Sequence, residues 1–275
     1  MKRLAKAIPA FFIVLLLATT KLYSQNSNIG TEFWTGYMDH VDGAGPTASQ
    51  MILYIASDVN TSGTVSFADG VTAAIPFKVV PNLATLVTIP SSLFLGDIES
   101  ITKKGIHITS LNPIAVYAHI YNSAVSGATL LLPVNTLAND YYSLNYKQLS
   151  NSLEERQEAK PSYSVFMFVA TEDNTTVEIT PSVDLLKDAS GIAHSAKNKY
   201  QVTLNKGEVY QGLSDSDLTG THIESISTNT GGCKRIAMFS GSSKIYIGSP
   251  NTSADNLFQQ VYLRHLGEKI TSLLL

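Results

Sequence analysis

Charge is scarce in this chain. Charged residues make up 15% of the 275 residues, and the formal net charge is −3, whereas an average globular protein carries roughly 25% charged residues. Nucleic-acid binding requires clustered lysine and arginine, and no basic stripe runs along the sequence. Ser, Thr, Asn and Gly take the place of charged residues in the composition. This composition excludes a nucleic-acid partner and favours an all-β extracellular protein over a helical cytosolic one.

Cysteine is almost absent, since Cys233 is the only one. An exported protein with a lone cysteine has no internal disulfide framework, so its sheets must be held by core packing. The hydrophobic fraction of 44% is sufficient for a sizeable core. Cys233 precedes an apolar run, so we expect a buried or half-buried thiol rather than a catalytic one. Phosphate-binding glycine loops, nucleophile elbows and paired carboxylates in an aromatic cleft are also missing, which predicts a non-enzyme without cofactors.

Long helical periodicity is missing after the N-terminus. The one helix candidate, residues 151–160, is stopped by Pro161. Short runs rich in Val, Ile, Thr, Tyr and Phe recur instead, separated by Gly, Asn, Asp, Ser and Pro, and this even spacing predicts an all-β sandwich architecture. The runs are 51–57, 63–68, 83–90, 105–110, 114–121, 128–134, 163–171, 175–181, 199–205, 221–228, 234–241 and 244–249.

The N-terminus has the features of a secretory signal peptide. A basic start precedes the apolar run 7–18, which is shorter than the ~20 residues of a spanning helix, although an anchor helix is the alternative. We predict cleavage near Ser24 or Gln25, and hence a secreted or cell-surface protein. Removing residues 1–24 takes away four of the 19 basic residues and no acidic one, so the net charge becomes −7.

The sequence contains an internal duplication. Residues 53–67 resemble 168–181, with Ala56 over Ala170, and residues 105–110 resemble 220–225, with His107 over His222. We therefore predict two tandem β-sandwich-like lobes that follow the cleaved signal peptide. The predicted boundaries are 1–24 for the signal peptide, 25–146 for the first lobe, 147–161 for a polar linker and 162–275 for the second lobe.

His107 and His119 raise the question of a metal site. We expect residues 105–120 to form a hairpin with its loop at 110–112, which places His107 opposite Ala115 and ~13 Å from His119. Two ligands of one zinc ion must lie much closer, since each bond is only ~2 Å. The histidines are thus interpreted as sheet residues.

Several strings resemble the N-terminal domain of the IgGFc-binding protein family, which occurs in a mucin-associated animal protein and in many secreted bacterial proteins. They are GTEFWTGYM (30–38), LYIAS (53–57), KGIHITSLNPIAVYA (104–118), LLPVNTL (131–137), FVATEDNTTVEITP (168–181) and DNLFQQVYL (255–263). The resemblance implies an extracellular binding or adhesion module and supplies no catalytic residues. The sequence departs from the family pattern near Leu263, which suggests a truncated second lobe with an unpaired sheet edge.

Aromatic and acidic residues give the candidate sites. Tyr117, His119 and Tyr121 are predicted to share one strand face that could contact a ligand, unless that face packs on the other lobe. Trp34 beside Glu32 could belong to a sugar-stacking platform, although Trp is more often a core anchor. No metal site is predicted; the weak calcium candidates in two polar loops, which turn chemistry explains equally well, are Asp58, Asn60, Glu172, Asp173 and Asn174.

Three functions remain open at this point. The first is a secreted or surface binding module that recognises glycoproteins or other surface proteins through Ser, Thr, Asn and Tyr side chains. The second is a passive spacer module of a larger surface protein. The third is a carbohydrate-active enzyme with two carboxylates ~5–10 Å apart in a pocket between the lobes.

Overall fold

The computed structural model describes most of the chain, and the statements below concern these residues: 28–40, 49–96, 100–122, 125–146, 162–188, 190–229, 231–245 and 254–262. The predicted signal peptide, the helix candidate at 151–160, the polar linker and the departure after Leu263 lie outside them. The described elements are strands and two short 3-10 turns, η2 (Ser91–Leu93) and η3 (Val134–Thr136), so the all-β prediction is confirmed.

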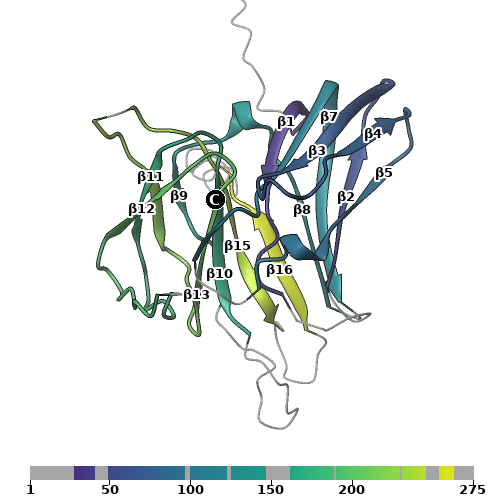
Figure 1. Cartoon of the computed structure of the whole chain (residues 1–275). Helices are drawn as coiled ribbons and strands as arrows, with labels where there is room; N and C mark the ends of the chain where they lie inside the picture. Colours follow the sequence, from purple (N-terminus) through teal and green to yellow (C-terminus); the bar gives the residue numbers. More distant parts are fainter. Residues whose placement is uncertain are drawn as a thin grey trace, which may run out of the picture.

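Sixteen strands form three antiparallel groups (Figure 1). The curved sheet contains β1 (Gly30–Thr35), β2 (Gln50–Ala56), β3 (Thr61–Phe67), β4 (Ile75–Val79), β5 (Thr85–Ile89), β7 (Ile106–Asn122) and β8 (Val125–Leu130). The central sheet contains β6 (Ser100–Thr102), β10 (Ser164–Ala170), β13 (Val209–Ser214), β15 (Ile236–Ile245) and β16 (Asp255–Gln260). The outer sheet contains β9 (Asp140–Tyr142), β11 (Thr175–Thr180), β12 (Tyr200–Leu204) and β14 (His222–Ser225).

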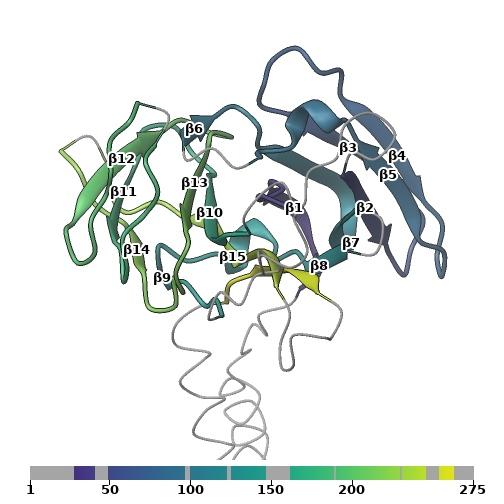
Figure 2. The same ribbon diagram turned by 90° about the horizontal axis from the view of Figure 1, so that it is seen from below.

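The central sheet lies between the other two, as both views show (Figures 1 and 2). Its strand β10 is buried along its whole length. Because side chains alternate across a strand, Met167 and Val169 join the core with the curved sheet, whereas Phe166 and Phe168 join the core with the outer sheet. A continuous apolar run, rather than an alternating one, is what a strand buried on both faces requires.

Strand pairing confirms the duplication. The pairs β3–β4, β3–β7, β1–β7, β2–β5, β2–β7 and β7–β8 have the counterparts β11–β12, β11–β14, β9–β14, β10–β13, β10–β15 and β15–β16. The aligned alanines, Ala56 and Ala170, end β2 and β10. The long strand β7 thus corresponds to β14 and β15 together.

The hairpin predicted for residues 105–120 is wrong, because β7 runs unbroken through Pro113. Side chains satisfy the backbone where a turn was expected: the Asn112 N–H donates to Thr61 Oγ1 at 3.0 Å, and Ser57 Oγ donates to the Pro113 carbonyl at 2.8 Å. His107 lies opposite Trp34 and Ser66, not Ala115.

Two short strands from the first half complete sheets of the second half. β6 pairs with β13, and β9 pairs with β14. β9 therefore lies with the later strands although it precedes the predicted linker. As a division into separate domains, the boundary at 147–161 stays a prediction.

Candidate functional site

The outward side of β7 brings together three predicted site residues. Even-numbered residues from Ile114 to Ile120 are buried, so Tyr117, His119 and Tyr121 point to the other side of the sheet. The His119 ring stacks on Tyr121 with 5.1 Å between ring centroids, and Tyr117 is 46% exposed. The common face that alternation predicts for these residues is present, and it is open to solvent.

Neighbouring strands extend this surface in rows. Tyr54 lies opposite Tyr117, and this pair is flanked by Leu86 on β5, beside Tyr54, and by Leu130 on β8, beside Tyr117. The next row is Thr88, Ile52, His119 and Ala128, and beyond it Gln50 accepts a hydrogen bond from the Tyr121 hydroxyl. We call the outward residues Ile52, Tyr54, Leu86, Tyr117, His119, Tyr121 and Leu130 the tyrosine face. Sequence reasoning missed Tyr54, although Ile52 and Tyr54 alternate with the buried Met51, Leu53 and Ile55.

The tyrosine face is uncharged at neutral pH. Within the described strands β2, β5, β7 and β8 there is no Lys, Arg, Asp or Glu. Burial lowers the pKa of His119, which favours its neutral form. Beneath the face, the buried Tyr37 hydroxyl donates to the Ile52 carbonyl at 3.0 Å, and burial raises the pKa of Tyr37 well above its usual range. The surface therefore offers ring area and hydroxyl groups without a net charge.

Trp34 does not join this face. It is only 4% exposed and belongs to the core, as expected of a core anchor. His107 stacks on it with 4.1 Å between ring centroids and bonds to Glu32 through Nε2 at 2.9 Å. Lys206 Nζ lies 5.8 Å from the Trp34 ring centroid, within reach of a cation–π interaction. The arrangement accounts for His107 as a structural residue of the sheet.

The second copy repeats this arrangement. His222 lies opposite Tyr142, stacks on it at 4.7 Å, and bonds to Asp140 at 2.7 Å. In both copies the carboxylate lies two residues before the aromatic residue. The repeat of the whole group supports the interpretation of His107 and His222 as sheet residues that the duplication encodes.

We expect His107 to make stability depend on pH. Burial lowers its pKa below 6.5, although the bond to Glu32 acts in the opposite direction and the Lys206 charge adds to the lowering. As pH falls below 6.5 towards the folded-state pKa, the unfolded state binds the proton first, so the folded state loses stability. Between about pH 7.5 and pH 5, the free energy of unfolding should therefore fall more in the wild type than in His107→Gln, as followed by Trp34 fluorescence in urea. Equal pH dependence in the two proteins would contradict this assignment.

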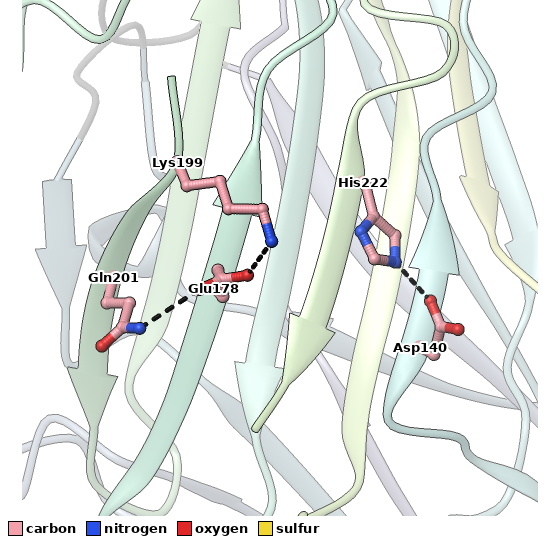
Figure 3. A network of polar contacts seen from close by, with 5 residues as sticks. All are labelled: Asp140, Glu178, Lys199, Gln201 and His222. Atoms are coloured by element: carbon pink, nitrogen blue, oxygen red, sulfur yellow. Dashed lines mark hydrogen bonds and ion pairs between the residues drawn. The ribbon is translucent and has the colours of Figure 1, made fainter. Parts of the chain in front are cut away.

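The solvent side of the outer sheet has the opposite character (Figure 3). Lys199 Nζ bonds to Glu178 at 2.6 Å, and Gln201 Nε2 bonds to the other Glu178 oxygen at 3.2 Å. These bonds lower the pKa of Glu178. Solvent-exposed ion pairs of this kind contribute little to stability. We interpret this side as a solvated charged surface.

The acidic loop between β10 and β11 makes contacts typical of a turn. Asp173 Oδ1 accepts a bond from the Lys206 N–H at 2.9 Å, and Asn174 has a left-handed backbone with φ +54°. The other calcium candidates lie with them or, for Asp58 and Asn60, between β2 and β3. Among the described residues, no group of three or more His, Cys, Asp or Glu side chains could hold a metal ion.

Two further expectations can be compared with the structure. Cys233 is exposed, not buried as expected, because β15 begins only at Ile236. A cavity of about 470 Å³ is lined by two acidic residues, Asp184 and Asp215, but its described lining residues all come from the second half of the chain. It is not the pocket between lobes that the enzyme hypothesis requires.

The comparisons give one family. The model described as IgGFc binding protein matches residues 127–269, just over half of the chain. No curated protein and no solved structure matches. Within the described residues there is no helix long and apolar enough to cross a membrane. The matched residues include most of β8 and all strands of the central and outer sheets except β6. The chain belongs to the IgGFc binding protein family.

Proposed function

We propose that the chain is a non-catalytic extracellular binding module that recognises a surface protein or glycoprotein through the tyrosine face. The observation behind this proposal is the face itself, with three tyrosines and two leucines on four strands without Lys, Arg, Asp or Glu. Contiguous exposed apolar surface on a soluble protein marks interaction sites. Tyrosine provides a large contact area at low conformational cost.

Family membership and the N-terminal sequence support the same role. The matching family is named for binding, which favours a binding module over an enzyme. The predicted signal peptide would deliver the module outside the cell, where protein and glycoprotein partners are found. Asp58, Asn60, Glu172, Asp173 and Asn174 stay weak calcium candidates, so the ligand screen includes calcium as a variable.

The test is a binding screen of the purified protein against immobilised immunoglobulin Fc, mucins and a glycan panel, with and without calcium. A monomeric state and a cooperative thermal transition are checked first. Against a ligand that binds saturably, we expect Tyr117→Ala to weaken binding roughly 30-fold, the effect of a residue that contributes about 2 kcal/mol at an interface. Tyr121→Ala should act in the same direction.

Tyr142→Ala is the matched control, because Tyr142 is similarly exposed at 43% but lies on the outer sheet. Its binding should equal that of the wild type. A folded protein without any ligand in the screen would favour the spacer hypothesis. A ligand that binds all three variants equally would place the binding surface elsewhere.

A further inference from the structure

A cavity opens at one end of the tyrosine face. Its floor includes Ala56 and Ala115, which lie opposite each other on β2 and β7, and Ala84, just before β5. The pairing of Ile55 with Thr85 places Ala84 in the same row. The adjacent row contains Leu86, Tyr54 and Tyr117, so a row of small side chains follows a row of large ones. The cavity has a volume of about 520 Å³, within the range of about 300–1,000 Å³ typical of ligand sites.

The walls of the cavity are apolar. They are formed by Ile29 before β1, Val59 between β2 and β3, Leu83 between β4 and β5, and Pro113 in β7. Ile29 is 44% exposed, Val59 49% and Leu83 62%. Three exposed aliphatic side chains around one cavity form a contiguous apolar surface, and such a surface gains free energy when it is covered.

Local hydrogen bonds fix these walls. Asn82 has φ +63°, and the Leu83 N–H donates to the Val80 carbonyl at 3.2 Å, which closes a tight turn. On the opposite side, Ser57 Oγ donates to the Pro113 carbonyl at 2.8 Å. A site that is shaped before the ligand arrives loses less entropy on binding.

The polar rim favours a positive charge. Asp58 lines the cavity and is exposed, and none of the described residues that line the cavity is Lys or Arg. The amide of Asn82 adds neutral polar atoms. A ligand with an apolar group and an adjacent cation therefore matches the cavity, because an exposed carboxylate beside an apolar recess attracts positive charge.

We propose that this cavity receives a bulky apolar side chain of the protein ligand, and that Asp58 pairs with a Lys or Arg next to it in the ligand. The inference rests on the proposed function and identifies the part of the partner that anchors it. Interfaces are typically dominated by a few such anchors seated in well-packed pockets.

The test uses three acetylated hexapeptides as probes, Gly-Ser-Trp-Lys-Ser-Gly and the versions with Trp-Gln or Ala-Lys at the centre. Binding to the full protein is titrated by saturation-transfer NMR in buffer with EDTA, which removes any contribution of calcium. We expect the Trp-Lys peptide to bind about tenfold more tightly than the Ala-Lys peptide. Equal binding of these two peptides would overturn the inference.

Variants locate the contact. Ala84→Leu and, independently, Ala115→Leu fill the cavity and should weaken the Trp-Lys peptide about tenfold. Ala193→Leu is the control, since Ala193 is exposed but lies outside both the cavity and the tyrosine face. Asp58→Asn should weaken the Trp-Lys peptide roughly threefold and leave the Trp-Gln peptide unchanged. Unaltered binding in both filled variants would place the peptide elsewhere and overturn the inference.

The outcomes separate this inference from the proposed function. In one outcome, Tyr117→Ala weakens the binding of a protein found in the screen, whereas Ala84→Leu and Ala115→Leu leave peptide binding unchanged. The tyrosine face then remains the binding surface, and the assignment of the cavity as the anchor site is wrong. In the other outcome, the peptides bind as expected but Tyr117→Ala leaves the binding of every protein ligand unchanged. The cavity is then supported as an anchor site, and the proposed binding role of the tyrosine face is wrong.

Discussion

Replacing Phe168 with alanine is expected to lower the free energy of unfolding by about 3–5 kcal/mol. Phe168 is fully buried in β10, on the side of the central sheet that faces the outer sheet. Its ring contacts the Tyr210 ring with 5.5 Å between centroids. Because the strand is held on both sides by packed sheets, the cavity left by the ring has little freedom to collapse.

Urea unfolding measures this loss, and Leu111→Ala is the control. Leu111 is 79% exposed, so its removal should change stability by no more than about 0.5 kcal/mol. Trp34 fluorescence reports the core with the curved sheet, whereas far-UV circular dichroism reports all strands. Coincident transitions would mean that the two cores unfold together. A loss below about 1 kcal/mol for Phe168→Ala would contradict the packing described for β10.

Gly241→Ala is the second large effect that we expect. Gly241 lies in β15 opposite Phe258 of β16, and a Cβ atom there would come within 1.8 Å of the Leu257 carbonyl oxygen. That oxygen belongs to the backbone, so β16 itself must move. We expect a loss of about 1–3 kcal/mol in the free energy of unfolding, the usual cost of overpacking.

The comparison variant is Gly232→Ala. A Cβ atom at Gly232 would meet no heavy atom within 4 Å. The same chemical change should therefore be neutral or should stabilise by up to about 1 kcal/mol, through the reduced freedom of the unfolded chain. Thermal unfolding of both variants under one condition provides the measurement. Similar melting temperatures would show that β16 does not pack against Gly241 as described.

The sequence was sufficient to predict the all-β class and the duplication, because both depend on local patterns. Short runs rich in Val, Ile, Thr, Tyr and Phe locate β2, β10 and β11 within a few residues. The misreading of β7 has a local origin. Asn112 and Pro113 are typical of turns, but the hydroxyls of Thr61 and Ser57 supply the bonds that keep the chain extended there. Those partners are more than fifty residues away in the sequence, so the pattern of residues around Pro113 could not predict these hydrogen bonds.

The candidate site was predictable only in part, for a similar reason. The common face of Tyr117, His119 and Tyr121 follows from alternation along one strand. Tyr54 joins them only through the register between β2 and β7, and the cavity is lined by residues from four separate parts of the chain. Strand register and loop packing are set by contacts between segments that are distant in the sequence. The spacing of residues within one segment does not predict such contacts.

The pairing of β6 and β9 with strands of the second half affects the order in which the sheets can form during synthesis. Synthesis begins at the N-terminus, and folding can start before the chain is complete. β6 and β9 leave the ribosome early, yet Ser100 pairs with Gln211 and Tyr142 pairs with His222. β6 and β9 can pair with their partner strands only after about eighty or more further residues have emerged from the ribosome. During translation, the first copy can pair its own strands while β6 and β9 remain unpaired. The newborn chain therefore completes its outer sheet only after β14 has emerged, and its central sheet only after β16 has emerged.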